Sequence, residues 1–133
     1  MAIQGFEDKT HELNEYELTV LVPNIVRHLK TKVGEKNAVT NSYVCKKYKE
    51  AGKKLSSVRF RKIINHIRIH GLVFNLVASS KGYYVANSQS ECERFIESLD
   101  QRINAITKVR DAMFYQMNRT IKENEKPHND ENK

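Results

Sequence analysis

The sequence predicts a mainly α-helical protein with a small β-hairpin, an α+β fold class, extended by one long C-terminal helix. Three observations predict this class. Apolar residues recur at helical spacing in four segments, two short β-prone runs lie together after the third of these segments, and the last segment continues for about 30 residues. A chain of 133 residues has room for one domain with a real core plus appended segments.

The first predicted helix carries an apolar stripe that stops before Gly34. Pro23 lies inside the pattern, so the helix either starts near Thr19 with proline in its first turn or is kinked there. Residues 1–14 are polar and acidic without sustained periodicity, and we expect a flexible arm. The stripe consists of Leu18, Leu21, Val22, Ile25, Val26, Leu29 and Val33.

Two further helices are predicted, each with a hydroxyl side chain as candidate N-cap. Thr40 precedes a short helix that ends at Gly52. Ser56 or Ser57 opens the next helix, which Gly71 ends as a left-handed residue after the last turn. The buried stripe of this third helix consists of Phe60, Ile63, Ile64 and Ile67.

The hairpin is predicted from two apolar runs, 72–77 and 82–86, which are separated by the polar and basic residues 78–81. Ala38 and Val39, ahead of the second helix, are expected to add a short edge strand to this hairpin. The elements described so far predict one domain.

We place that domain at residues 15–88 and the C-terminal helix at 89–123, with Ser88 or Ser90 as its N-cap and a disordered tail at 124–133. At 1.5 Å per residue, about 30 residues extend about 45 Å. The apolar seam of this helix either folds back over the domain or pairs with a second copy, and we favour a homodimer. Arg110 interrupts the seam, which consists of Ile96, Leu99, Ile103, Ile106, Met113 and Met117.

Basic charge is concentrated in the middle of the chain. Residues 27–84 contain fourteen Lys or Arg and two Glu, a net charge of +12, whereas the whole chain carries +7. A polyanionic partner is the simplest physical reason to hold so much self-repelling charge in one region.

The order helix, short strand, helix, linker, helix and hairpin resembles the winged helix-turn-helix DNA-binding proteins, particularly the small type encoded by phages and prophages. The segments that carry the resemblance are TNSYVCKKYKEAG, LSSVRFRKIINHIRIHG and LVFNLVASSKGYYVA, and it covers roughly residues 18–87. It implies that the third helix of the domain enters the major groove of double-stranded DNA while other elements hold phosphates.

The outward face of that helix is basic with one amide. Arg59, Arg61 and Lys62 have the chemistry to reach guanine acceptors or phosphates, and Asn65 matches adenine. The further residues that we expect at the DNA are hydroxyls and lysines at the helix starts, the connecting turn and the wing tip: Thr40, Ser42, Lys53, Lys54, Ser56, Ser57, Ser80 and Lys81.

The pattern excludes several other classes. No phosphate-binding glycine loop, GxSxG or HExxH motif is present, so we expect neither an enzyme nor a cofactor or small-molecule substrate. Cys45 and Cys92 lack CxxC spacing, and His66 and His70 lack a third ligand, so we expect no metal site. No apolar run approaches about 18 residues, and no secretory signal is evident, so we expect a cytoplasmic protein without membrane contact, in a bacterial host if it is phage-encoded.

The function predicted is therefore double-stranded DNA binding, in transcription regulation or as an accessory to replication or recombination. The alternative is a protein–protein interaction module, an adaptor or anti-repressor, that uses the same fold. RNA binding is a third interpretation, but we expect the tyrosines to be structural, whereas RNA recognition favours exposed aromatic platforms.

Overall fold

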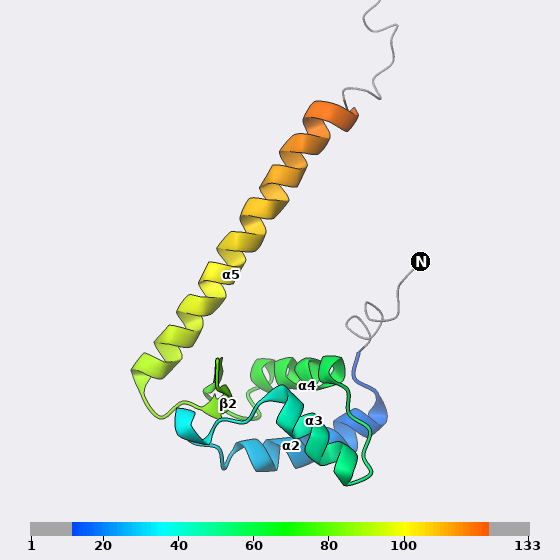
Figure 1. Cartoon of the computed structure of the whole chain (residues 1–133), viewed down its shortest axis with the longest axis vertical. Helices are drawn as coiled ribbons and strands as arrows, with labels where there is room; N and C mark the ends of the chain where they lie inside the picture. Colours follow the sequence, from blue (N-terminus) through cyan, green and yellow to red (C-terminus); the bar gives the residue numbers. More distant parts are fainter. Residues whose placement is uncertain (1–11, 123–133) are drawn as a thin grey trace, which may run out of the picture. The chain divides into compact units, whose positions relative to one another are not determined.

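The computed structural model describes residues 12–122, so residues 1–11 of the predicted arm and the predicted tail at 124–133 lie outside the described residues. This part of the chain is mainly helical with a small two-stranded antiparallel sheet, which confirms the α+β class (Figure 1). The elements are η1 (Glu17–Leu21), α2 (Val22–Leu29), η2 (Glu35–Asn37), α3 (Asn41–Glu50), α4 (Ser57–Ile69), β1 (Leu76–Ser79), β2 (Gly82–Val85), α5 (Gln89–Gln116) and η3 (Met117–Lys122).

The first helix begins earlier than its apolar stripe predicts. The backbone N–H of Asn14 donates to Glu17 Oε1 and the N–H of Glu17 donates to Asn14 Oδ1, both at 2.8 Å, which is a reciprocal capping box. The helix therefore starts at Glu15. Before Pro23, which has no N–H to donate, the turn widens into the π-helical η1, and the N–H of Val22 donates to the carbonyl of Glu17.

The ends of the predicted stripe are not part of the core. Leu18, in η1, is 42% exposed, and Val33, which lies beyond the end of α2 at Leu29, is 43% exposed. The chain then turns so that Val33 forms a parallel bridge with Val85. Gly34 donates its N–H to the Val85 carbonyl at 2.9 Å, so these residues serve the sheet and not the helix.

The caps of α3 and α4 are confirmed. Thr40 Oγ1 accepts from the N–H of Tyr43, and Ser56 Oγ accepts from the N–H of Arg59, both at 3.1 Å. At the end of α4, Gly71 has a φ of 65°, and Leu72 donates its N–H to the carbonyl of Ile67 at 3.0 Å, as in a Schellman motif.

The first strand of the hairpin lies later in the chain than predicted, whereas the second starts at Gly82 as predicted. Leu76 pairs with Val85 and Ser79 with Gly82, so the turn is reduced to Ser80 and Lys81. Residues 72–75 instead form a turn after α4.

The predicted edge strand is confirmed as a single antiparallel bridge between Val39 and Tyr83. Gly82 allows this approach, because a Cβ there would lie 2.3 Å from the carbonyl oxygen of Val39. The small sheet thus receives a third segment from the chain ahead of α3.

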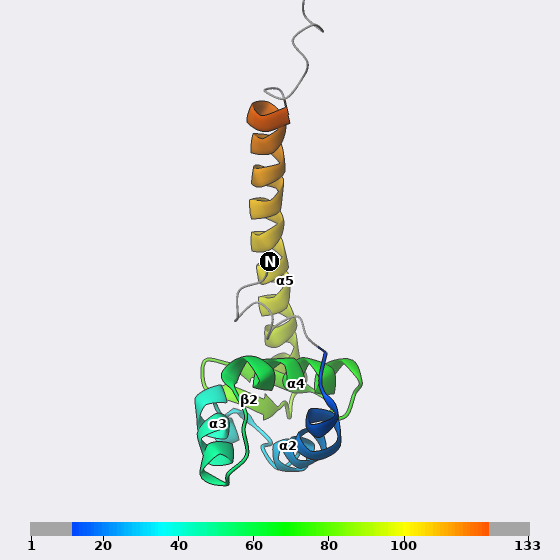
Figure 2. The same cartoon turned by 90° about the vertical axis from the view of Figure 1, so that its right-hand side faces the viewer.

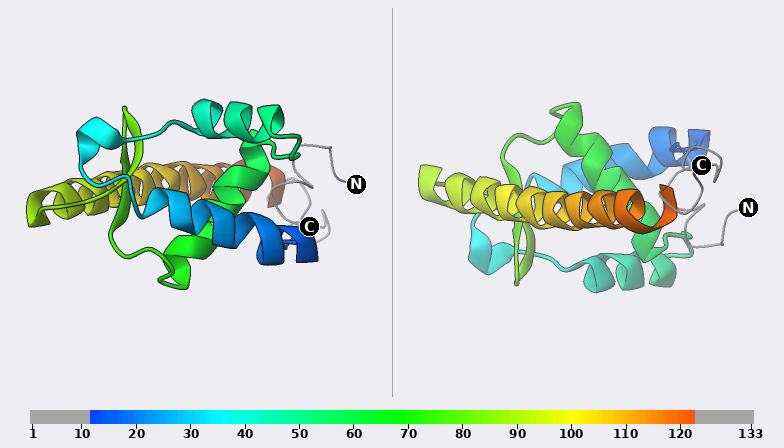
Figure 3. Two further views of the ribbon diagram at one scale, coloured as in Figure 1. Left: turned by 90° about the horizontal axis from the view of Figure 1, so that it is seen from below. Right: turned by 90° about the horizontal axis from the view of Figure 1, so that it is seen from above.

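The core of the Met1–Phe95 unit forms where α2 and α3 both pack against α4. Figures 2 and 3 show α2 and α3 on the same side of α4, which crosses them. The buried stripe of α4 is as predicted: Phe60, Ile63, Ile64 and Ile67. Residues of the first helix, of the turn after α4 and of the hairpin complete the core: Leu21, Ile25, Leu29, Val73 and Leu76.

Arg68 joins α4 to the hairpin and to the first turns of α5. Its Nε donates to the carbonyl of Leu76 at 2.8 Å, and its guanidinium lies 4.6 Å from the ring centroid of Phe95. Cys92 and Phe95 also pack on a second small cluster around Tyr84. The start of α5 therefore belongs to the same unit as the hairpin.

The second unit, Ile96–Lys133, consists in its described part of the rest of α5 and η3.

The N-cap of α5 lies in the first unit. Ser88 Oγ accepts from the N–H of Glu91 at 3.3 Å, which confirms one of the two predicted caps.

Candidate nucleic-acid interface

The outward face of α4 is a row of exposed residues opposite its buried stripe. Ser57, Arg61, Asn65 and Ile69 follow at intervals of four and are all exposed, while Lys62 beside them is half-buried. Arg61 and Asn65 therefore present a cation and an amide to solvent from a rigid helix, as the sequence predicts.

Arg59 has a different environment from the one predicted. Its Nε donates to Glu17 Oε2 at 2.7 Å and its Nη2 to Glu17 Oε1 at 2.6 Å, and both side chains are largely buried, at 15% and 6% exposure. A third bond joins Arg59 Nη2 to the carbonyl of Glu12 at 3.0 Å. Arg59 thus fastens α4 to the first helix, and residues 12–14 are docked where we expected a flexible arm.

The ion pair between Arg59 and Glu17 changes the pKa of Glu17. The hydrogen bonds from Arg59 hold the pKa of Glu17 below its usual value, with help from the N–H of Asn14 and against the effect of burial. The charge of Arg59 is therefore compensated within the fold, and we remove this residue from the candidate DNA contacts.

The starts of α3 and α4 are tied together by a residue that sequence reasoning missed. Asn41 Nδ2 donates to the carbonyl of Ser57 at 3.2 Å, and Cys45 Sγ donates to Asn41 Oδ1 at 3.3 Å. Burial raises the pKa of the Cys45 thiol, and the positive charge of Arg61 acts in the opposite direction. The sequence signal that could have identified Asn41 was an amide side chain directly after the Thr40 cap.

The hydroxyl residues predicted at the starts of α3 and α4 are all exposed. They are Thr40, Ser42, Ser56 and Ser57.

A basic hollow of about 680 Å³ lies between the end of α3 and the start of α4. The prediction included Lys53, Lys54 and Ser56, and the structure adds Lys46 and Lys49 from the side of α3 that faces away from the core. Four ammonium groups around one hollow, next to the N-terminus of α4, are suited to phosphate. We define these lysines as the lysine hollow.

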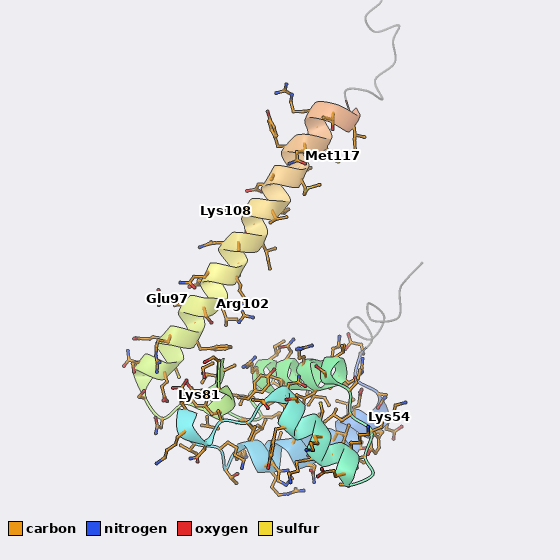
Figure 4. The ribbon with its side chains drawn as sticks, in the orientation of Figure 1. Lys54, Lys81, Glu97, Arg102, Lys108 and Met117 are labelled. Carbon is orange, nitrogen blue, oxygen red and sulfur yellow. The ribbon has the colours of Figure 1, made fainter. Side chains whose placement is uncertain are left out.

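The hairpin tip lies far from the lysine hollow. Ser80 and Lys81 are exposed at the turn, and Lys54 and Lys81 occupy opposite ends of the Met1–Phe95 unit (Figure 4). The predicted residues therefore do not converge on one point but lie along an extended surface, with α4 between the two ends. Within residues 12–122, neither Arg61, Lys81 nor any lysine of the hollow forms an ion pair.

Several other candidates have structural roles. Tyr84 is 2% exposed, and the half-buried ring of Tyr83 forms a T-shaped contact with Phe60, with 5.6 Å between the ring centroids, and lies 5.7 Å from the Arg68 guanidinium, so both tyrosines pack within the fold. The rings of His66 and His70 lie against each other with 4.2 Å between their centroids. Burial of His66 and the nearby charge of His70 both lower the pKa of His66. Among residues 12–122, no group of three or more His, Cys, Asp or Glu is placed to hold a metal ion, and no helix is long and apolar enough to cross a membrane.

The seam of α5 is broader than predicted. Ile96, Leu99, Ile103, Ile106 and Met113 are all exposed, at 38–69%, and Met117 is half-buried. The prediction missed further exposed apolar side chains on α5 and η3, among them Val109, Phe114 and Ile121. Phe114 and Ile121 lie on the same helix face, since each is three or four residues from a seam position.

Comparisons of this chain with models of protein families, with curated proteins and with solved structures gave no match.

Proposed function

We propose that this protein binds double-stranded DNA through a winged helix-turn-helix, with α3 and α4 as the helix pair and the β1–β2 hairpin as the wing. The observation that carries the proposal is the exposed face of α4 with Arg61 and Asn65, together with the lysine hollow and Lys81, whose cations form no ion pair in the described chain. The bridge from Val39 to Tyr83 supports the winged assignment, because it adds the strand ahead of α3 to the wing sheet.

Each part of this surface has a distinct expected role. The major groove of B-DNA admits an α-helix, and there an arginine pairs with guanine and an asparagine with adenine. Arg61 and Asn65 are the exposed residues of α4 with this chemistry. The lysine hollow and Lys81 would hold the backbone on either side, which positions the helix without reading sequence.

The test is fluorescence anisotropy of the full chain with selected and random duplexes over a salt series. We expect Arg61→Ala and Asn65→Ala to cost about 1–3 kcal/mol on the selected duplex and much less on random DNA, because they remove base contacts. We expect Lys46→Gln with Lys49→Gln to weaken binding to both duplexes and to lower the log–log salt slope by about 0.9 for each phosphate that the variant no longer neutralises.

Lys30→Gln is the matched control, because Lys30 is an exposed lysine that follows α2, outside α4, the lysine hollow and the wing. It should change neither affinity nor salt slope appreciably. Equal and small losses of affinity in all of these variants would show that α4 is not the reading helix. The absence of binding at low salt would reject the proposal.

We further propose that α5 pairs with α5 of a second copy. The seam alternates at intervals of three and four, which is the heptad pattern of a coiled coil, and its side chains are exposed in one chain. Arg110 occupies one seam position, where a charged residue lowers the stability of pairing while restricting register. A dimer would present two copies of α4 to a palindromic site.

The dimer is tested by light scattering after size exclusion. Ile103→Asp should convert dimer to monomer, because it places a carboxylate in the apolar seam, whereas Gln101→Asp, with the same charge change on the polar side of α5, should not. Arg110→Leu is expected to tighten the dimer. A monomeric wild-type chain at high concentration would rule the dimer out.

A second candidate, binding of another protein, is favoured by one specific observation. Ile69 and Phe74 are 79% and 76% exposed and line one hollow at the end of α4. Large apolar side chains that remain exposed together often mark protein contacts. If the anisotropy experiment detects no DNA binding, this is the surface to substitute first, with Phe74→Ser.

A further inference from the structure

A groove of about 480 Å³ opens between α2 and α3, and Phe60 from the buried stripe of α4 lines it. Its interior is apolar, and its volume lies within the range of small-molecule sites. Both helices pack on α4. The apolar residues that line the groove are Ile25, Leu29, Val39, Val44, Ala51 and Phe60.

The polar residues that line the groove are all neutral or basic. His28, Lys32, Lys47 and Lys53 contribute to its lining, and none of the lining residues is acidic. Lys47 Nζ lies 5.6 Å from the ring centroid of Tyr43, which directs this ammonium group along an aromatic wall of the same groove.

A hydrogen bond between α2 and α3 also fixes the wall of the groove. The hydroxyl of Tyr48 on α3 donates to Asn24 Oδ1 on α2. Burial raises the pKa of the Tyr48 phenol, so this residue stays neutral and keeps its proton for the bond. The groove is therefore a formed feature of the fold, with an apolar interior and a positive margin.

We propose that this groove binds a small amphipathic anion, with an apolar body against α2, α3 and Phe60 and a carboxylate or similar head among Lys32, Lys47 and Lys53. A neutral apolar ligand would leave these ammonium groups unused. A polyanion such as DNA would not fill an apolar interior. The groove shares Lys53 with the lysine hollow, but its apolar interior, Lys32 and Lys47 are not part of the proposed DNA surface, so its existence does not depend on the proposed DNA binding.

The test uses decanoate as the probe, with the ¹H–¹⁵N spectrum of the full chain as readout. At about 1 mM decanoate, amide shifts are expected to concentrate in α2, α3 and around Phe60. Lys32→Gln with Lys47→Gln should weaken the fitted affinity about tenfold, which corresponds to about 1.4 kcal/mol. Ala51→Trp, which fills the groove from its exposed rim, should abolish the shifts.

The matched control is Lys46→Gln with Lys49→Gln, which removes two exposed lysines from α3 outside this groove. It should leave decanoate affinity within about twofold of the wild type. Equal weakening by both pairs would show only general attraction of an anion. Equal binding of the cation decylammonium, or shifts caused by an acidic amphipathic peptide but not by decanoate, would overturn the proposal.

Discussion

Replacing Glu17 by alanine is expected to lower the free energy of unfolding by about 3–5 kcal/mol, because it leaves the guanidinium of Arg59 buried without its counter-charge. The same substitution removes the acceptor for the N–H of Asn14 at the start of the first helix. Urea denaturation followed by circular dichroism measures the change. A loss below about 1 kcal/mol would show that the pair behaves like an exposed salt bridge.

Glu17→Gln separates the two roles of this side chain. A glutamine still accepts from the N–H of Asn14 but carries no charge for Arg59, so we expect a loss smaller than that of Glu17→Ala. The double variant Glu17→Leu with Arg59→Leu should be more stable than either Glu17→Ala or Arg59→Ala, since no unpaired buried charge remains. Strictly additive losses would show that the two residues are not coupled.

The ion pair also gives stability a pH dependence. The pKa of Glu17 is lowered in the folded protein, so its contribution is complete above the ordinary Glu value of 4.5 and is lost as the pH falls through the lowered pKa. The wild type should therefore lose stability more steeply than Glu17→Gln as the pH falls below that value. Parallel curves would show that Glu17 does not carry the effect.

Gly82→Ala is expected to lower the free energy of unfolding by about 2–4 kcal/mol, because the new Cβ would lie 2.3 Å from the Val39 carbonyl oxygen and because φ is 122° at this position. The strain is relieved only if the bridge between Val39 and Tyr83 opens. Thermal unfolding measures the cost, and hydrogen exchange of the amides of these two residues, which bond to each other's carbonyls, reports the opening.

Gly52→Ala is the matched control for this prediction. Gly52 also has a positive φ, of 79°, but a Cβ there would meet nothing within 4 Å. Gly52→Ala should therefore lower the free energy of unfolding by only about 1–2 kcal/mol, which is the cost of a positive φ at a residue with a Cβ. It should leave the amides of Val39 and Tyr83 protected from hydrogen exchange. Equal costs at the two positions would mean that the contact with Val39 does not constrain the sheet.

The sequence was sufficient for features that depend on nearby residues. The caps at Thr40 and Ser56 and the left-handed residue Gly71 follow from local hydrogen bonds and φ preferences, so a pattern of a few residues predicts them. The buried stripe of α4 follows from helical periodicity in the same way. The exposure of Arg61 and Asn65 is the complement of that stripe.

The features that the sequence did not predict depend on residues far apart in the chain. The outward position of Arg59 on a helical wheel gives no indication that Glu17, 42 residues earlier, will neutralise it. The first strand begins at Leu76 and not at Leu72, because residues 72–75 turn the chain after α4, which apolar composition does not reveal. The capping box of Asn14 and Glu17 is the exception, since its spacing was visible but lay ahead of the apolar stripe.

The π-helical turn η1 makes the length of the chain between Asn14 and Pro23 a constraint in itself. The wide turn places the N–H of Val22 on the carbonyl of Glu17, and Glu17, Leu21 and Ile25 are all buried at intervals of four, with Glu17 against Arg59. Substitutions at exposed positions such as Val20 leave that geometry intact. Deletion or insertion of one residue here would rotate Glu17 away from α4, so this segment tolerates exchange of side chains but not a change in their number.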